Sequence, residues 1–204
     1  NGRKWTGFGN TRLEKNANGT IISGAGDDLH FSGIVFDGAG ATFTGHNIDL
    51  SGDRLTFEGN CGSQAAAGRA LRCTGSNITV IGGSNFWATT DVTATGYDIE
   101  VGVSGTATLY HYLSGIRTGS STGGVLLVDT GSHTLVGSQI GKLGITSGTS
   151  PGGVNGGVTL GNRILGDIDI ELSSASMASN TFGTITITMA AGASKTTIDR
   201  SNVT

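Results

Sequence analysis

A short glycine-led phrase recurs six times along this chain and limits the folds that it can adopt. Each copy has a glycine, two mostly polar residues and a short step that contains apolar residues, as in Gly45–Leu50 and Gly96–Val101. The copies begin 19, 30, 21, 35 and 30 residues apart, and such periods are typical of stacked supersecondary units. Because a glycine turn followed by alternation favours a strand, the pattern predicts coils of short β-strands. The leading glycines are Gly26, Gly45, Gly75, Gly96, Gly131 and Gly161.

Composition narrows the class of protein further. The 204 residues include 37 glycines and one proline, only 13% are charged, and the net charge is −3. That balance argues against nucleic acid as the main partner, because phosphate binding needs clustered basic residues. There is no apolar run long enough for a transmembrane helix, so we expect no membrane insertion. No motif for a metal, a phosphate or another cofactor is present, and one short helix is expected at 64–71, capped by Ser63.

Alternation within the repeats predicts which side chains face inward. Successive coils would stack these side chains at about 4.8 Å, the spacing between neighbouring strands. We therefore expect an all-β fold, a right-handed parallel β-helix, which is a single-stranded solenoid of about seven coils. Residues 1–172 are expected to form the coils, and 173–204 the last coil or a C-terminal cap of the same domain. The predicted inward residues are Leu29, Phe31, Ile48, Leu50, Ile78, Val80, Ile99 and Val101.

The first part of the chain resembles a known family. The segment from Trp5 to Leu13, with Asn18–Ile22 after it, looks like the glycine-rich opening of pectate-lyase-like β-helices, and Phe31–Gly38 resembles the strand–turn–strand phrase that follows. This combination is common in tailspike and tail-fibre proteins of bacteriophages. The resemblance covers about residues 5–59. It implies a homotrimer in the virion tail that acts outside the cell, at the host surface, on bacterial polysaccharide.

The resemblance also implies a ligand groove along one sheet, with loops at its edge. The expected groove strands are 20–23, 41–44, 70–73, 91–95 and 124–129. In the predicted register, Asp37, Glu58, Trp87 and Tyr110 point outward at one corner of successive coils. Two carboxylates about 5 Å apart suit a retaining glycosidase, which makes Asp37 and Glu58 candidate catalytic residues. The alternative is a solvated corner. Asp91, on the expected groove sheet, is a further catalytic candidate, although Asp also bonds turns readily.

Four other side chains are candidates for substrate binding beside Trp87. Arg69 and Arg72 could meet the carboxylates of acidic sugars, or they are solvated or intersubunit charges. Tyr110 and Tyr112 share one side of a strand, where they could stack on sugar rings or pack across a trimer axis. His111 should point the other way. An outward column of His30, Asp49, Thr79 and Glu100 is expected at an interface or a solvated face.

Two readings of function follow from the sequence. The first is a β-helix fragment of a phage tailspike or fibre that recognises, and could also depolymerise, bacterial surface polysaccharide. For the depolymerase activity, a glycoside hydrolase is expected rather than a lyase. The second is a non-catalytic structural or adhesive β-solenoid, such as a virion shaft or an adhesin segment. An ice-binding solenoid is disfavoured because the threonines do not repeat in register. We expect Cys61 and Cys73 to be free thiols, with a disulfide as the alternative.

Overall fold

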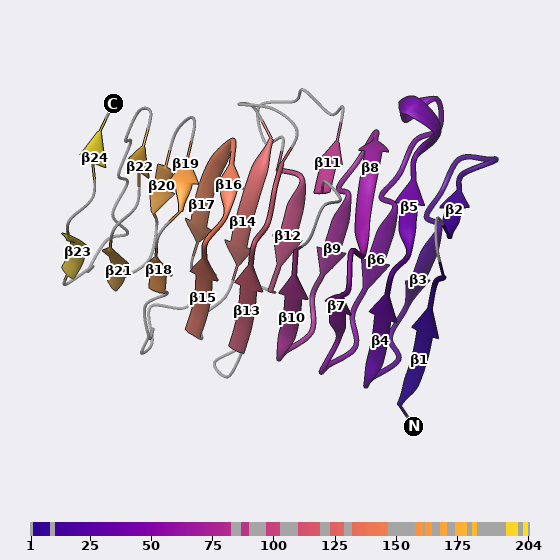
Figure 1. The fold of residues 1–204 in the computed structure, drawn as a ribbon, viewed down its shortest axis with the longest axis horizontal. Coiled ribbons are helices and arrows are strands. Elements are labelled where there is room, and N and C mark those ends of the chain that lie inside the picture. The colour runs from indigo at the N-terminus through magenta and orange to yellow at the C-terminus, as the bar shows by residue number, and fades with distance from the viewer. Residues whose placement is uncertain are drawn as a thin grey trace.

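The chain folds as a β-solenoid of parallel strands. A computed structural model describes residues 2–8, 11–82, 87–89, 97–102, 110–118, 123–128, 132–146, 158–160, 162–164, 168–170, 174–178, 181–182, 195–199 and 202–203. The strands lie side by side in a row that runs from β1 (Arg3–Thr6) to β23 (Lys195–Asp199) (Figure 1). The all-β, parallel architecture expected from the repeats is confirmed.

Four sheets make up the faces of the solenoid. Sheet A has nine strands, sheet C seven, and sheets B and D four each. Sheet A contains, in spatial order, β1, β4 (Leu29–Ser32), β7 (Thr56–Glu58), β10 (Ile78–Ile81), β13 (Tyr110–Ser114), β15 (Ser132–Val136), β18 (Val158–Leu160), β21 (Ser174–Ala178) and β23. Sheet C contains β3 (Ile22–Gly24), β6 (Ile48–Leu50), β9 (Leu71–Cys73), β12 (Ile99–Val101), β14 (Gly124–Val128), β17 (Lys142–Thr146) and β20 (Ile168–Ile170).

The two smaller sheets close the coils. Sheet B contains β2 (Arg12–Glu14), β5 (Val35–Asp37), β8 (Gly62–Ala66) and β11 (Trp87–Thr89). Sheet D contains β16 (Gln139–Ile140), β19 (Arg163–Ile164), β22 (Thr181–Phe182) and β24 (Asn202–Val203). Strands β21 to β24 thus extend sheets A and D into the described parts of the segment 173–204. Because the sheets differ in strand number, the expected count of about seven coils is not supported.

Columns of apolar side chains fill the interior. In sheet A, Phe31 pairs with Phe57, and their rings stack 5.0 Å apart at 11°. In sheet C, Ile48, Leu71 and Ile99 pair in turn and are fully buried. Each such side chain contributes about 1.5–3 kcal/mol by leaving water. Of the eight predicted inward residues, seven are buried, and Leu29 packs partly buried against the core.

The helix predicted at 64–71 is wrong. Residues 62–66 form β8, which pairs in parallel with β5 on one side and β11 on the other. Hydrogen bonds to two neighbouring coils satisfy this backbone, whereas a helix of two turns is marginal on its own. The one helical element among the described residues is a 3-10 turn, η1 (Ala39–Ala41). In the part of the chain that the structure describes, no helix is long and apolar enough to cross a membrane.

The glycine-led phrase marks corners rather than coils. The copy at Gly26 leads into β4 of sheet A, but the copy at Gly45 leads into β6 of sheet C. One coil runs between residues that pair, for example from Phe31 to Phe57. The expected outward column of His30, Asp49, Thr79 and Glu100 is therefore wrong, since these side chains are divided between sheets A and C.

One corner needs glycine because adjacent coils come very close. A Cβ atom at Gly52 would collide with the carbonyl of Gly26, and one at Gly75 with the carbonyl of Gly52. These neighbours are backbone atoms of the coil below, which cannot move away as a flexible side chain can. Gly26 and Gly75 of the repeat, with Gly52 between them, thus set the contact between coils at this corner.

Both cysteines are buried in the core as free thiols, as expected. Burial raises the pKa of the Cys61 thiol to about 12, and it raises that of Cys73 as well. Since the thiolate is the reactive form, both groups are protected from alkylation while the chain is folded.

Candidate functional site

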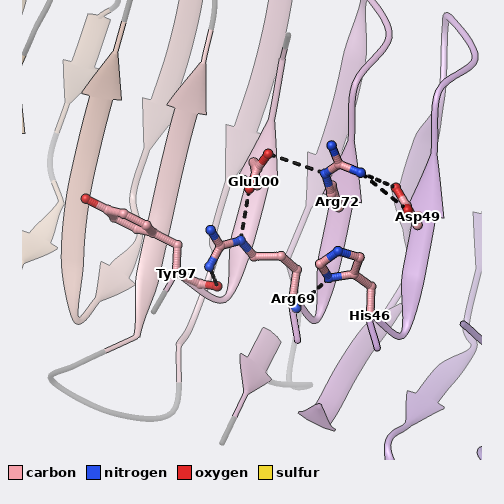
Figure 2. Close-up of polar contacts among 6 residues, drawn as sticks. All are labelled: His46, Asp49, Arg69, Arg72, Tyr97 and Glu100. Carbon is pink, nitrogen blue, oxygen red and sulfur yellow. Dashed lines mark hydrogen bonds and ion pairs between the residues drawn. The ribbon is translucent and has the colours of Figure 1, made fainter. Parts of the chain in front are cut away.

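Sheet C carries a ladder of opposite charges on its outer face. Asp49, Arg72 and Glu100 occupy paired positions on β6, β9 and β12. Arg72 Nη1 lies 3.3 Å from Asp49 Oδ1, and Arg72 Nε lies 3.4 Å from Glu100 Oε1. Parallel pairing at about 4.8 Å brings such residues into contact whenever they fall in register. Arg72 therefore joins three successive strands by ionic contacts (Figure 2).

Arg69 extends this ladder from the corner before β9. Its Nε donates to Glu100 Oε2 at 2.9 Å, and its Nη1 donates to the carbonyl oxygen of Tyr97 at 2.9 Å. Only 14% of the Arg69 side chain and 19% of the Glu100 side chain are exposed. Hydrogen bonds to charged groups in such partly buried positions contribute about 1.5–3 kcal/mol each. We call Asp49, Arg69, Arg72 and Glu100 the charged ladder.

His46 supports the ladder at its corner. Its Nδ1 accepts a hydrogen bond from the backbone N–H of Arg69 at 2.8 Å. Partial burial lowers the pKa of His46, and the nearby positive charges of Arg72 and Arg69 act in the same direction. The imidazole is therefore held neutral, with Nδ1 as an acceptor.

Tyr97 covers the next strands of the same face. Its ring lies under Lys142 Nζ, which is 4.3 Å from the ring centroid, a distance typical of a cation–π contact. A Cβ atom at Gly144 would collide with the Tyr97 hydroxyl and lie 2.7 Å from Tyr97 Cζ. The absence of a side chain at Gly144 thus lets the ring lie across β17 (Figure 2).

The predicted role of the arginines changes in view of this geometry. Arg69 and Arg72 do lie close together, and both contact carboxylates of this chain. An acidic sugar would have to compete with Asp49 and Glu100 for them. The sequence pattern gave no sign of these partners, because Asp49 and Glu100 belong to other coils.

The two tyrosines lie on the outer face of sheet A. Tyr110 is 57% and Tyr112 44% exposed, whereas His111 between them is buried, as the alternation predicts. Tyr112 pairs with Thr79 of β10 and Thr134 of β15. A recess of about 290 Å³ opens here. Its lining residues, which we call the tyrosine recess, are Asn77, Ile78, Thr79, Tyr110, His111, Tyr112 and Thr134.

The floor of the tyrosine recess is firmly packed. Ile78 pairs with His111, and His111 pairs with His133; all three are buried. The His111 and His133 rings stack with centroids 5.5 Å apart, and His111 Nδ1 accepts from the backbone N–H of Ile78 at 3.4 Å. The strands that carry the tyrosines are therefore fixed from inside.

The predicted register of Asp37 and Glu58 is wrong. Asp37 ends β5 in sheet B, where it pairs with Glu14 and Gln64, whereas Glu58 ends β7 in sheet A. The two residues follow equivalent-looking phenylalanines, but those phenylalanines lie on different sheets. The carboxylate beside Asp37 is Glu14, which sequence reasoning missed.

Each of these two acids also has a basic partner. Asp37 forms an ion pair with Arg12, and its Oδ1 accepts from the backbone N–H of Ala39 at 2.9 Å. Glu58 Oε1 lies 2.7 Å from His30 Nε2. Asp37 is only 8% exposed, so its contacts shape the turn into η1.

Trp87 cannot serve as an exposed sugar platform in this fold. It is fully buried on β11, opposite the buried Ser63, and its ring meets Phe57 edge-on at 5.8 Å. The expectation of an outward Trp87 is wrong because β11 belongs to sheet B, where this position faces the core. Asp91 lies outside the described residues, as does Asp129.

The expected groove strands fall partly on one sheet. Three of them correspond to β3, β9 and β14 of sheet C, while 41–44 forms a turn and 91–95 lies outside the described residues. The strands β6 and β12 lie between the three. No group of three or more His, Cys, Asp or Glu side chains in the described ranges could hold a metal ion.

Comparison with known proteins gives no relative. No family model, no curated protein and no solved structure matches this chain. The functional conclusion therefore depends on the fold and on the geometry of these two faces.

Proposed function

We propose that this chain is a β-helical segment of a phage tailspike or tail fibre that recognises bacterial surface polysaccharide. In this proposal the coils wind right-handed, three copies associate, and the protein acts at the host cell surface from the virion tail. Two features support it: the parallel solenoid fold and the resemblance of residues 5–59 to the opening of such β-helices.

The tyrosine recess is the observation that carries the proposal. Tyrosine presents a flat apolar ring and a polar hydroxyl at low conformational cost, and a sugar ring offers C–H groups and hydroxyls in return. Asn77, Thr79 and Thr134 supply further hydrogen-bonding groups beside the two rings. A shallow, polar-edged aromatic surface on a rigid sheet suits an extended glycan.

Cleavage is the less supported part of the proposal. The side chains first proposed as catalytic, Asp37 and Glu58, lie on different sheets. A carboxylate pair is still offered by Asp37 and Glu14, which are paired on neighbouring strands. Neighbouring strands lie about 4.8 Å apart, and a separation of that size suits a retaining hydrolase. That pair lies on sheet B, away from the tyrosine recess on sheet A, so binding and cleavage would use separate surfaces.

The alternative function is a structural shaft or adhesive solenoid without catalysis. The charged ladder favours it, because Arg69 and Arg72 connect strands of the same chain and are engaged by its own carboxylates, Asp49 and Glu100. A shaft would bury the tyrosines between subunits, whereas a receptor-binding segment would leave them accessible to glycans.

A glycan-binding assay tests the proposal. The purified chain is incubated with capsular and O-antigen glycans, and binding, new reducing ends and the absorbance of unsaturated uronates are followed. We expect binding to at least one glycan, weakened about tenfold or more by Tyr110→Thr or Tyr112→Thr. Phe8→Ala is the matched control, since Phe8 is 84% exposed outside the recess. No binding across the panel, or equal binding by the tyrosine variants, would contradict the proposal.

The same assay separates the enzymatic readings. New reducing ends without ultraviolet absorbance indicate a hydrolase, and Glu14→Gln and Asp37→Asn should then abolish them. A rise in absorbance indicates a lyase. Binding without either signal identifies a recognition module.

A further inference from the structure

The two exposed tyrosines of the recess are lined up along one strand. Tyr110 and Tyr112 are two residues apart on β13 and face the same side. At about 3.3 Å per residue, their Cα atoms are about 6.6 Å apart along the strand. Strands cross the long axis of the solenoid (Figure 1), so the line through the two tyrosines crosses it too.

The flanks of the two rings follow the same direction. Thr79 and Thr134 stand on either side of Tyr112, one on β10 and one on β15. Asn77 precedes β10 by one residue, which brings it beside Tyr110, and it also lines the recess. The amide and hydroxyl groups thus border a path that runs along β13.

The described lining of the recess offers no ionic partner. Its seven lining residues include no Asp, Glu, Lys or Arg, and the single histidine among them, His111, is buried beneath the rings. The next outward residue on the neighbouring strand, opposite Thr79, is Thr56. A carboxylated sugar bound here would lose water without gaining a counter-charge, which is unfavourable.

The two arginines of the charged ladder are already paired with carboxylates of this chain. Arg69 and Arg72 contact Glu100, and Arg72 also contacts Asp49. A uronate would have to displace these carboxylates. Folding already holds them beside the arginines, whereas a free sugar would lose entropy on binding. Acidic sugars are therefore disfavoured both in the recess and at the charged ladder.

From these observations, and building on the proposed glycan-binding function, we infer that the tyrosine recess binds an uncharged stretch of polysaccharide that lies along β13, across the solenoid axis. Each tyrosine stacks on one of two nearby sugar rings. Asn77, Thr79 and Thr134 bond the hydroxyls at the edges of those rings. The packed floor beneath Tyr110 and Tyr112 holds both platforms in place before the glycan arrives, which lowers the cost of binding.

Affinity for defined oligosaccharides tests the chemical class. The probes are neutral hexose oligosaccharides from O-antigens and uronate-containing oligosaccharides from capsules, titrated calorimetrically against the intact chain. We expect neutral probes to bind, with affinity unchanged between low and high salt, because no ionic contact is screened. Binding of uronate probes that weakens with salt and is lost in Tyr112→Thr would overturn the inference while leaving glycan recognition intact.

A relocation variant tests the direction. Tyr110→Thr combined with Thr134→Tyr keeps two exposed tyrosines but sets them on neighbouring strands, along the solenoid axis. We expect this double variant to bind as weakly as Tyr110→Thr alone, about tenfold below the native chain. Affinity equal to that of the native chain would mean that the glycan follows the axis.

Two further outcomes are informative in different ways. If no glycan of either class binds, the proposed function fails together with the inference. If the native chain forms oligomers in sedimentation experiments and Tyr110→Thr/Tyr112→Thr dissociates them, the recess is an interface between copies and the inference is overturned. Thermal unfolding of each variant confirms that the fold is intact before any binding result is interpreted.

Discussion

The outer faces of sheets A and C are built from the same parallel register but use it differently. On sheet C, the register brings Asp49, Arg72 and Glu100 into contact, so these charged side chains form ion pairs with one another. On sheet A, the same spacing sets Tyr112 between two threonines and leaves 44% of it exposed. Charges on a solenoid face are thus candidates for holding coils together, and exposed aromatic rings are candidates for holding a ligand.

The largest expected effect comes from breaking the charged ladder. Glu100→Gln removes the carboxylate that both arginines share, and it leaves Arg69 with a partly buried charge beside a neutral amide. We expect a loss of about 2–3 kcal/mol in the free energy of unfolding, measured by denaturant titration. Glu14→Gln, at an exposed position on β2, is the matched control and should change stability by less than about 0.5 kcal/mol. Equal small effects would mean that the ladder does not stabilise the coils.

A second prediction concerns the place where Tyr97 crosses β17. Gly144→Ala puts a methyl group where the tyrosine ring lies and forces the ring away from Lys142. We expect a loss of about 1–2 kcal/mol. The rate at which Cys61 and Cys73 are alkylated reports it, since burial protects both thiols until the chain opens.

Gly26→Ala provides the control for this substitution. A Cβ atom at Gly26 would meet only the Leu29 side chain, at an ordinary 3.7 Å. Its alkylation rate should therefore stay near that of the native chain. Faster alkylation of Gly26→Ala than of Gly144→Ala would contradict the packing described for Tyr97.

The third prediction concerns acid sensitivity on the sheet C side. Because the pKa of His46 is lowered from its ordinary 6.5 in the folded chain, the unfolded chain binds this proton more readily. The stabilising contribution of neutral His46 is therefore complete above about pH 6.5 and is lost progressively as the pH falls towards the lowered pKa. His46→Gln, which can still accept from the Arg69 N–H, should make unfolding free energy less dependent on pH in that range. An unchanged slope would contradict the lowered pKa of His46 in the folded chain.

The smallest effect is expected on sheet A. Tyr110→Thr/Tyr112→Thr keeps good strand propensity and matches the neighbouring threonines, so unfolding free energy should change by no more than about 0.5–1 kcal/mol. Thermal and denaturant unfolding measure this directly. A loss as large as that of Glu100→Gln would erase the contrast between the two faces, because the tyrosines would then serve the fold.

The fold was more predictable from the sequence than the site. Alternation alone identified Phe31, Ile48 and Val80 as core residues, since a strand shows its buried face every second residue. It also oriented Tyr110, His111 and Tyr112 correctly. These are local properties, which depend on a strand and not on what lies beside it.

The residues that meet across coils could not be predicted in the same way. The glycine-led phrase occurs wherever a corner precedes a strand, so Gly26 and Gly45 looked equivalent although they serve sheets A and C. Asp37 was therefore set beside Glu58 rather than Glu14. Which side chain faces Arg72 depends on the length of each coil, and that length is fixed by turns whose sequences resemble one another.

The unequal lengths of the coils have a consequence for how such chains change over time. The chain uses more residues to travel from Val80 to Leu113 than from Phe57 to Val80, yet Val80 pairs in register with both partners. An insertion or deletion in the gene can therefore be absorbed at a corner without shifting the strands on either side. During evolution, proteins with this architecture can therefore replace their exposed corner loops one at a time while the stacked strands stay the same.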